Sequence, residues 1–242
     1  AHKPVDAMMK TWIDQVGYLV VDVKRNNSKV SLTQRRFLSD GSISSKNRWS
    51  IPIHIEEGNH ESSILMKSQK SVVSLKNIDS NFIVNSGRYG FYRVQYDDNS
   101  LANLSLLIDE KILNHVDRWS LQNDLFSQCV SGTKQIQEYL DFTTSYHDED
   151  NYITLQNLAQ NLYYLYKLTR KEKFSDEIRT YTAQFLGTIF DRLGWDSQKN
   201  EKHTNALLRS FVITALGKLG DKEILSEANK RFNKFLKNKN SL

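Results

Sequence analysis

The order of hydrophobic and polar residues changes once along the chain, from a period of two to a helical period. In the first part hydrophobic and polar residues alternate, and β-branched and aromatic residues are frequent, which is typical of half-buried strands. Polar turns separate the alternating stretches, which predict strands over residues 18–24, 29–38, 49–55, 62–68, 71–75, 82–84 and 90–96. Short strands at this spacing predict a β-sandwich or a barrel.

Pro52 lies within the third of these stretches. Because proline has no backbone N–H to donate to a neighbouring strand, we expect this strand to lie at a sheet edge or at a bulge. The paired acids Glu56 and Glu57 follow in a predicted turn, where solvation by water is enough to explain them.

The second part, from Leu101 onward, predicts seven helices over residues 101–113, 118–131, 134–146, 152–169, 176–193, 204–219 and 222–237. Asp117 and Ser175 stand at expected N-cap positions, and Gly132 and Gly220 at expected C-terminal caps. Short loops between the helices favour a superhelical, solenoid-like array. The predicted fold class is therefore multidomain, β then α: a small β-sandwich followed by an α-helical array.

Composition and charge narrow the range of partners. Hydrophobic residues make up 39% and charged residues 25% of the 242 residues, which is typical of globular domains. The formal net charge is +5, and its densest basic stretch, 230–239, fits the solvated end of a helix, so neither nucleic acid nor a membrane is a predicted partner. The single cysteine, Cys129, cannot form an intramolecular disulfide, which favours a reducing compartment and a cytoplasmic location.

The sequence offers no catalytic constellation and no metal site. The six histidines are scattered and form no H-E-x-x-H pair, and there is no G-x-S-x-G elbow, P-loop or G-x-G-x-x-G motif. His147 and the three acids after it could attract a cation, but acids before a helix more often favour its positive end. Cys129 lies in a helical run, where a small buried hydrophobic residue is expected.

Several stretches together resemble the M1 zinc aminopeptidase family, in particular its puromycin-sensitive and archaeal tricorn-interacting members. The matching stretches are Lys3-Pro4-Val5, Met9-x-x-Trp12 with Gln15-x-Gly17-Tyr18, Leu32-x-Gln34-x-Arg36-Phe37, Trp49-x-Ile51-Pro52-Ile53, Gly90-x-Tyr92-Arg93-Val94-x-Tyr96, Asp117-Arg118-x-x-Leu121-x-x-Asp124-x-Phe126, and Leu208-Arg209 with Leu219-Gly220-Asp221. Leu19 departs from the family, which usually has a proline there.

The resemblance implies a division of the chain into three parts. Residues 1–14 would be the remnant of the last helix of a catalytic domain, 15–98 a β-sandwich spacer, and 99–242 the first part of a truncated α-helical C-terminal domain. In the family the zinc motif H-E-x-x-H, its downstream Glu, the G-x-M-E-N motif and the transition-state Tyr lie upstream of such a piece. This chain would then have no catalytic residues and no cofactor, the zinc belonging to the parent enzyme.

The resemblance also implies a function. The chain would be the non-catalytic C-terminal fragment of a zinc-dependent aminopeptidase that removes N-terminal residues from peptides, serving as spacer and helical lid over the substrate chamber. Its partners would be the upstream catalytic domain of the same polypeptide and the peptide substrate. The alternative is a stand-alone helical module that binds a protein or peptide and has no enzymatic activity.

Three residues of the fourth predicted helix are candidates for contact with substrate. Tyr163 and Tyr166 offer stacking surfaces, and Lys167 offers a cation for a peptide carboxylate. The alternative is core packing for the tyrosines and solvation for the lysine. Arg209 is interpreted as a tie between helices.

Overall fold

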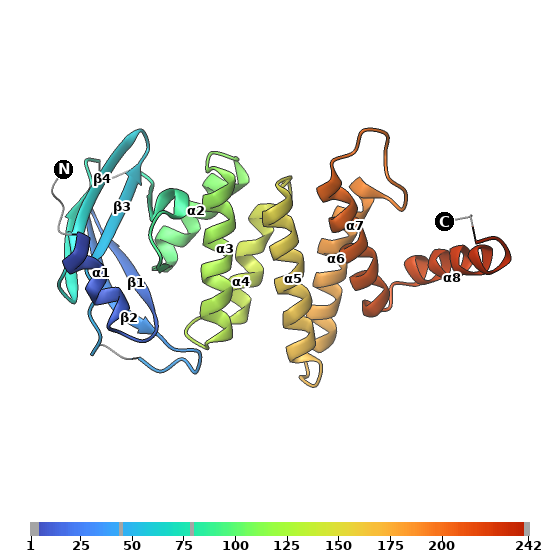
Figure 1. Ribbon diagram of the computed structural model, residues 1–242, viewed down its shortest axis with the longest axis horizontal. Coiled ribbons are helices and arrows are strands. Elements are labelled where there is room, and N and C mark those ends of the chain that lie inside the picture. The colour runs from blue at the N-terminus through green and yellow to red at the C-terminus, as the bar shows by residue number, and fades with distance from the viewer. Residues whose placement is uncertain (1–4, 44–45, 78–79, 240–242) are drawn as a thin grey trace. The chain divides into compact units, whose positions relative to one another are not determined.

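The computed structural model describes residues 5–43, 46–77 and 80–239. The chain forms two compact units, Ala1–Glu149 and Asp150–Leu242, which are described separately. In Figure 1 the first is coloured blue to green and the second yellow to red. The Lys3-Pro4 part of the first matching stretch lies outside the described residues.

The first unit contains one short helix, two small sheets and three further helices. Its elements in chain order are α1 (Val5–Ile13), β1 (Tyr18–Asn26), β2 (Lys29–Phe37), β3 (Ile51–Glu57), β4 (His60–Met66), β5 (Lys70–Ser74), β6 (Phe82–Val84), the 3₁₀ turn η1 (Ser86–Arg88), β7 (Arg93–Tyr96), α2 (Asp98–Asp109), α3 (His115–Val130), α4 (Ile136–Thr143) and the 3₁₀ turn η2 (Thr144–Tyr146). α3 packs against β7, η1 and α4.

The strands form a sheet with the order β5-β2-β1-β7 and a second sheet with the order β4-β3-β6. β1 pairs antiparallel with β2 and parallel with β7. Buried and more exposed residues alternate along β3, and Trp49, Ile51 and Tyr92 are among the largest fully buried side chains. The predicted β-then-α fold is confirmed, because the period-two pattern follows from strands that have one buried face.

The structure corrects the expectation for Pro52. β3 is the middle strand of its sheet, and its register with β4 runs without a bulge from Ile51 to Glu57. The short β6 pairs only with residues Ile55 to Glu57. At Pro52 the strand therefore has a partner on one side only, which meets the requirement that the missing N–H imposes.

The structure also corrects both predicted N-caps. The N-cap of α3 is Asn114, whose side chain accepts hydrogen bonds from the backbone N–H groups of Val116 and Asp117. Asp117 lies inside the first turn, because its carboxylate is directed toward the sandwich. Ser175 is the first helical residue of α6, after Phe174. The predicted left-handed glycines are confirmed, with φ values of 77° and 87° for Gly132 and Gly220.

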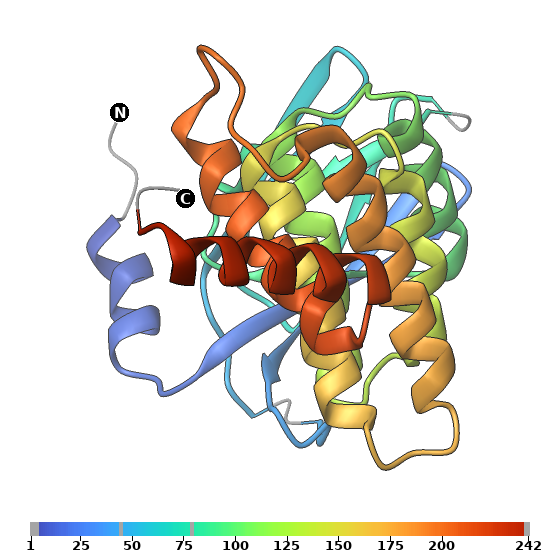
Figure 2. The same ribbon diagram turned by 90° about the vertical axis from the view of Figure 1, so that its right-hand side faces the viewer.

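The second unit consists of α5 (Tyr152–Thr169), α6 (Ser175–Leu193), α7 (His203–Leu219) and α8 (Lys222–Lys237). The first three pack on one another around a core that includes Ala159, Leu186 and Val212. α8 contacts α7 and runs across this layer, as Figure 2 shows. Each of these helices lies within one residue of its predicted bounds.

Candidate functional site

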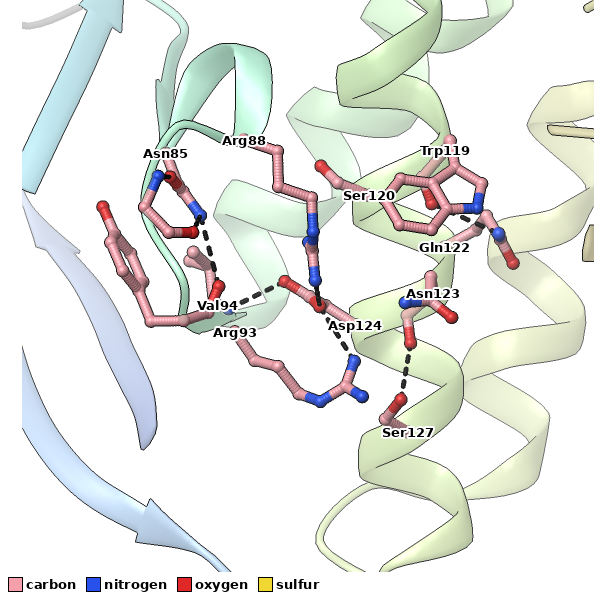
Figure 3. A network of polar contacts seen from close by, with 12 residues as sticks. Asn85, Arg88, Arg93, Val94, Trp119, Ser120, Gln122, Asn123, Asp124 and Ser127 are labelled. Carbon is pink, nitrogen blue, oxygen red and sulfur yellow. Dashed lines mark hydrogen bonds and ion pairs between the residues drawn. The ribbon is translucent and has the colours of Figure 1, made fainter. Parts of the chain in front are cut away.

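A cluster of buried polar contacts lies where α3 meets the loop between β6 and β7. Asp124, on α3, accepts hydrogen bonds from Arg88 Nη2 at 3.0 Å, Arg93 Nη1 at 3.1 Å and the backbone N–H of Val94 at 2.9 Å. Figure 3 shows both arginine side chains converging on this carboxylate. The Asp124 side chain is 6% exposed, so the ion pairs act where water screens them little.

The loop that supplies Arg88 has an uncommon backbone. Asn85, Gly87 and Arg88 have φ values of 65°, 65° and 53°, a region that costs side chains other than glycine free energy. The Asn85 side chain holds this shape, because its Nδ2 donates to the carbonyl oxygens of Gly90 and Tyr92 and its Oδ1 accepts from the N–H of Gly90. Hydrogen bonds within the loop therefore help to hold its shape.

Aromatic rings support the two arginines. The Arg88 guanidinium lies over the Trp119 ring at 5.1 Å, and that of Arg93 lies over the rings of Tyr18 and Phe37 at 5.4 and 5.3 Å. Burial is the largest influence and would lower the pKa of Arg88, but the charge of Asp124, the hydrogen bond to it and the interaction with Tyr18 together outweigh burial and raise that pKa above its usual value. Both arginines are held as cations between rings and carboxylate.

Asp117 makes a second connection between α3 and the same loop. Its carboxylate accepts hydrogen bonds from the backbone N–H of Gly87 at 2.7 Å, Ser86 Oγ at 3.2 Å and Asn114 Nδ2 at 2.5 Å. Burial raises the pKa of Asp117 above its usual value, against the effect of these hydrogen bonds, and the charge of Glu56 raises it further.

The next residue, Arg118, points to the end of the first unit. It forms two hydrogen bonds with the buried Glu149 carboxylate, at 2.6 and 2.8 Å, and one with the carbonyl oxygen of Leu113 at 2.7 Å. The Tyr146 hydroxyl donates to the carbonyl oxygen of Arg118 at 2.7 Å. The charged residues of the Asp117–Phe126 stretch therefore join the sandwich, α3 and η2 into one unit.

The three candidate substrate residues lie together on α5. The Tyr163 ring is 6.3 Å from that of Tyr166 and meets Phe211 of α7 edge-on at 6.4 Å. Both tyrosines are half-buried against the core of the second unit. Lys167 is exposed, with Nζ 5.4 Å from the Tyr163 ring centroid and 5.7 Å from that of Tyr164. Their contact with a substrate stays a prediction.

Arg209 is a tie between helices, as expected. Its guanidinium, on α7, donates to the carbonyl oxygens of Leu193 and Gly194 at the end of α6, and it pairs with Glu201 at 2.5 Å. The tie stays within the second unit.

The acids near His147 are already engaged with protein groups. His147 contacts the carboxylates of Asp109 at 3.1 Å and Asp148 at 3.3 Å, while Glu149 faces Arg118. Asn151 is the residue that caps α5. Within the described ranges no group of three or more His, Cys, Asp or Glu side chains could hold a metal ion, so no chemical step is assigned to a metal here.

Two other residues from the sequence analysis, Glu57 and Cys129, are both buried. Glu57 ends β3 and is buried, accepting hydrogen bonds from the backbone N–H groups of Lys76 and Asn77, so the expectation of a solvated turn is wrong for it. Cys129 is buried as expected, and burial raises the pKa of its thiol to about 12.

Arg93 and Asp124 stand in stretches that resemble the family, but nothing in the sequence predicts their pairing, and Arg88 lies outside those stretches. One signal was available in the sequence: several charged residues stand among the hydrophobic positions of a predicted helix. Charges on the inner face of a helix must be paired, so these residues could have been expected to have partners. Their partners lie 31 and 36 residues away, beyond the reach of any local pattern.

The fold is that of a small β-sandwich followed by an α-helical array. A comparison with known protein families agrees with this fold. The family described as ERAP1-like C-terminal domain matches residues 81–242. The chain belongs to this family.

Curated relatives extend the similarity over the sandwich. Aminopeptidase M1 of Arabidopsis thaliana is 30% identical, covering 99% of this chain and 29% of that protein. Probable aminopeptidase 2 of Sulfurisphaera tokodaii is 34% identical, covering 79% and 24%. Tricorn protease-interacting factor F2 of Thermoplasma acidophilum is 30% identical, covering 90% and 26%. The resemblance to M1 aminopeptidases is confirmed, and the chain spans less than a third of the length of these relatives.

Among the helices of the described residues, none combines the length and the apolar character that a membrane span requires.

Proposed function

We propose that this chain is the non-catalytic C-terminal part of a zinc-dependent aminopeptidase that removes N-terminal residues from peptides. The observation that carries the proposal is the similarity along nearly the whole chain to proteins named as aminopeptidases, of which it covers 24–29%. The zinc and the catalytic groups would belong to the upstream domain of the same polypeptide. The single cysteine supports a cytoplasmic location.

A role as spacer is supported by the junction between sandwich and helices. Asp117 and Asp124 tie α3 to the loop, and Arg118 ties α3 to Glu149 just beyond η2, through ion pairs and hydrogen bonds of defined geometry. Buried charged groups tolerate few alternative arrangements, because displacement leaves a charge without a partner. Such a junction would hold the start of the helical domain in a fixed orientation to the sandwich, as a lid over a substrate chamber requires.

The surface of α1 supports its assignment to an upstream catalytic domain. None of its residues is buried, and Val5, Met9 and Ile13 are exposed. Trp12 ties the end of the helix to the sandwich through a hydrogen bond from Nε1 to the carbonyl oxygen of Ser50 at 3.0 Å. Apolar side chains on an otherwise polar helix would be covered if α1 packed on a further domain.

The test compares the 242-residue chain with the longest polypeptide encoded in frame with it. We expect the longer polypeptide to hydrolyse aminoacyl reporter substrates and to lose this activity when zinc is chelated, and we expect no turnover by the 242-residue chain. Turnover by this chain above a chelator-treated control would contradict the assignment. An inactive longer polypeptide would instead favour the stand-alone binding module.

Tyr163, Tyr166 and Lys167 are proposed to meet the C-terminal part of the peptide. In the longer polypeptide, Lys167→Ala should raise KM for peptides with a free C-terminal carboxylate by up to about fivefold, because an exposed ion pair contributes up to about 1 kcal/mol. Amidated peptides and single-residue reporters should not respond. Lys171→Ala, which removes an exposed cation just beyond α5, is the matched control. Equal effects of the two substitutions would refute the role of Lys167.

A further inference from the structure

A cavity of about 460 Å³ lies in the first unit between the smaller sheet and helices α2 and α3. Its walls are mostly apolar and include Phe82, Leu107 and Leu113. Two carboxylates, those of Glu56 and Asp117, belong to the same lining. The volume is within the range of sites that hold small organic molecules.

The two carboxylates share one hydroxyl group. Ser86 Oγ lies within hydrogen-bond distance of both Glu56 and Asp117, but a hydroxyl has a single proton to donate. The other donors to Asp117 are the neutral Gly87 N–H and the Asn114 amide. The two acids therefore lie on either side of one hydroxyl group, and the described donors to both of them are neutral.

Cations that could offset these charges point elsewhere. Arg88 and Arg93 are directed at Asp124, and Arg118 at Glu149. In the described part of the cavity wall there is no Lys, Arg or His. Like charges this close disfavour each other in a partly desolvated site, and the raised pKa of Asp117 agrees with this environment.

We propose that this cavity binds an amphipathic organic cation, a primary ammonium or a guanidinium carried on an apolar stem. The side chain of a lysine or arginine in a peptide has this chemistry. The cationic group donates to Glu56 and Asp117 and supplies the positive charge that their neutral partners lack, and the stem lies against Phe82 and Leu113. The site lies in the sandwich and its junction, and binding there does not depend on the proposed aminopeptidase function.

The experiment uses 4-phenylbutylamine, a protonated amine at pH 7, and the neutral 4-phenyl-1-butanol of nearly equal shape. Each is titrated into the ¹⁵N-labelled 242-residue chain while backbone amide shifts are recorded. We expect saturable shifts at Gly87 and Leu113, with a Kd for the amine at least tenfold below that for the alcohol.

Two glutamates provide the matched variants. Glu56→Gln should weaken amine binding about tenfold and leave alcohol binding unchanged. Glu61→Gln removes an equal charge from the residue opposite Glu56 on β4, whose side chain is 71% exposed and does not line the cavity, so it should change the Kd less than twofold. Ile112→Trp, at a 63% exposed position of the rim, should block the entrance and abolish binding of both probes.

Three results would overturn the proposal. Equal affinity for amine and alcohol would mean that the carboxylates do not select the ligand. Equal losses in Glu56→Gln and Glu61→Gln would show a diffuse attraction of charge rather than a site. Absence of shifts at the solubility limit of the amine would show that the cavity does not bind this class. If Glu56→Gln fails to fold, the ratio of the Kd values for amine and alcohol and the result for Ile112→Trp still test the proposal.

Discussion

At the scale of single residues, Asp124 accepts hydrogen bonds from two guanidinium groups and a backbone amide while almost fully buried. The pair of arginines leaves an excess of one positive charge, which the rings of Trp119, Tyr18 and Phe37 accommodate on their faces. Removing the carboxylate would leave two half-buried cations with no anion to pair with in this network.

Asp124→Ala should therefore lower the free energy of unfolding of the first unit by about 3–5 kcal/mol, the usual cost of removing one partner of a buried ion pair. Urea denaturation followed by tryptophan fluorescence measures this change. Asp148→Ala removes an acid whose side chain is 72% exposed, and it should change the free energy by less than about 0.5 kcal/mol. A loss below 1 kcal/mol for Asp124→Ala would mean that the network contributes little.

Asp117 gives a prediction with a pH dependence. Burial and the charge of Glu56 raise its pKa in the folded state above the unfolded value of about 3.9. A carboxyl with a raised folded-state pKa favours folding most below the unfolded value, and this contribution is lost as the pH rises through the folded value. Asp117→Asn does not titrate, so the substitution should cost more stability at pH 4 than at pH 7. A cost that grows with pH would contradict the raised pKa.

At the scale of elements, the hydrophobic period located the strands and helices because burial of one face is what makes each element form. The same local pattern did not determine which polar residue caps a helix. Asn114 and Asp117 are both residue types that often cap helices. In the structure Asn114 caps α3, while the Asp117 carboxylate accepts a hydrogen bond from the Gly87 N–H instead. The pairing of Arg88 with Asp124 could not be predicted from the local pattern either, because Arg88 has a left-handed backbone conformation that the sequence does not indicate.

Helix α8 is the least buried element of the second unit. Ile224 is its buried residue, while Leu225, Phe232 and Leu236 are exposed. Its other anchor is Arg231, which pairs with Asp196 at 2.7 and 2.9 Å and lies over the Trp195 ring at 4.9 Å. An element with little buried apolar surface should open without global unfolding.

Ile224→Ala should thus raise hydrogen exchange of the α8 amides at least tenfold and leave α5 unchanged, because truncating a buried isoleucine costs about 2–5 kcal/mol. Native-state exchange read by mass spectrometry resolves the two helices. The control Leu236→Ala, at an exposed position of the same helix, should have no effect. Equal acceleration in α5 and α8 would show that the helices open together.

At the scale of the whole molecule, the chain consists of two compact units, and its single thiol lies in the first. With a pKa of about 12, Cys129 is a thiolate in about one molecule in 10⁵ at pH 7. The folded unit should thus protect the thiol both by burial and by keeping it protonated.

Modification of Cys129 by an aromatic disulfide reagent should be at least 1,000-fold slower in the native chain than in 6 M guanidinium. The Asp124→Ala chain should react faster than the wild type, because it opens its first unit more often. The absorbance of the released thiolate follows the reaction. Comparable rates in native and unfolded chains would show that the thiol is accessible in the folded state.

The parallel pairing of β1 with β7 has a consequence for the order in which the protein takes shape during synthesis. Until Tyr96 has left the ribosome, one edge of β1 has no neighbour, although the hairpin of β1 and β2 is complete. The strand that fills this edge continues directly into α2. The larger sheet can therefore be completed only just before the helices begin, and its last strand is also held by α3 through the hydrogen bond from the Val94 N–H to Asp124. A chain that began at residue 81, where the family match begins, would contain β7 but not β1, the strand with which β7 pairs.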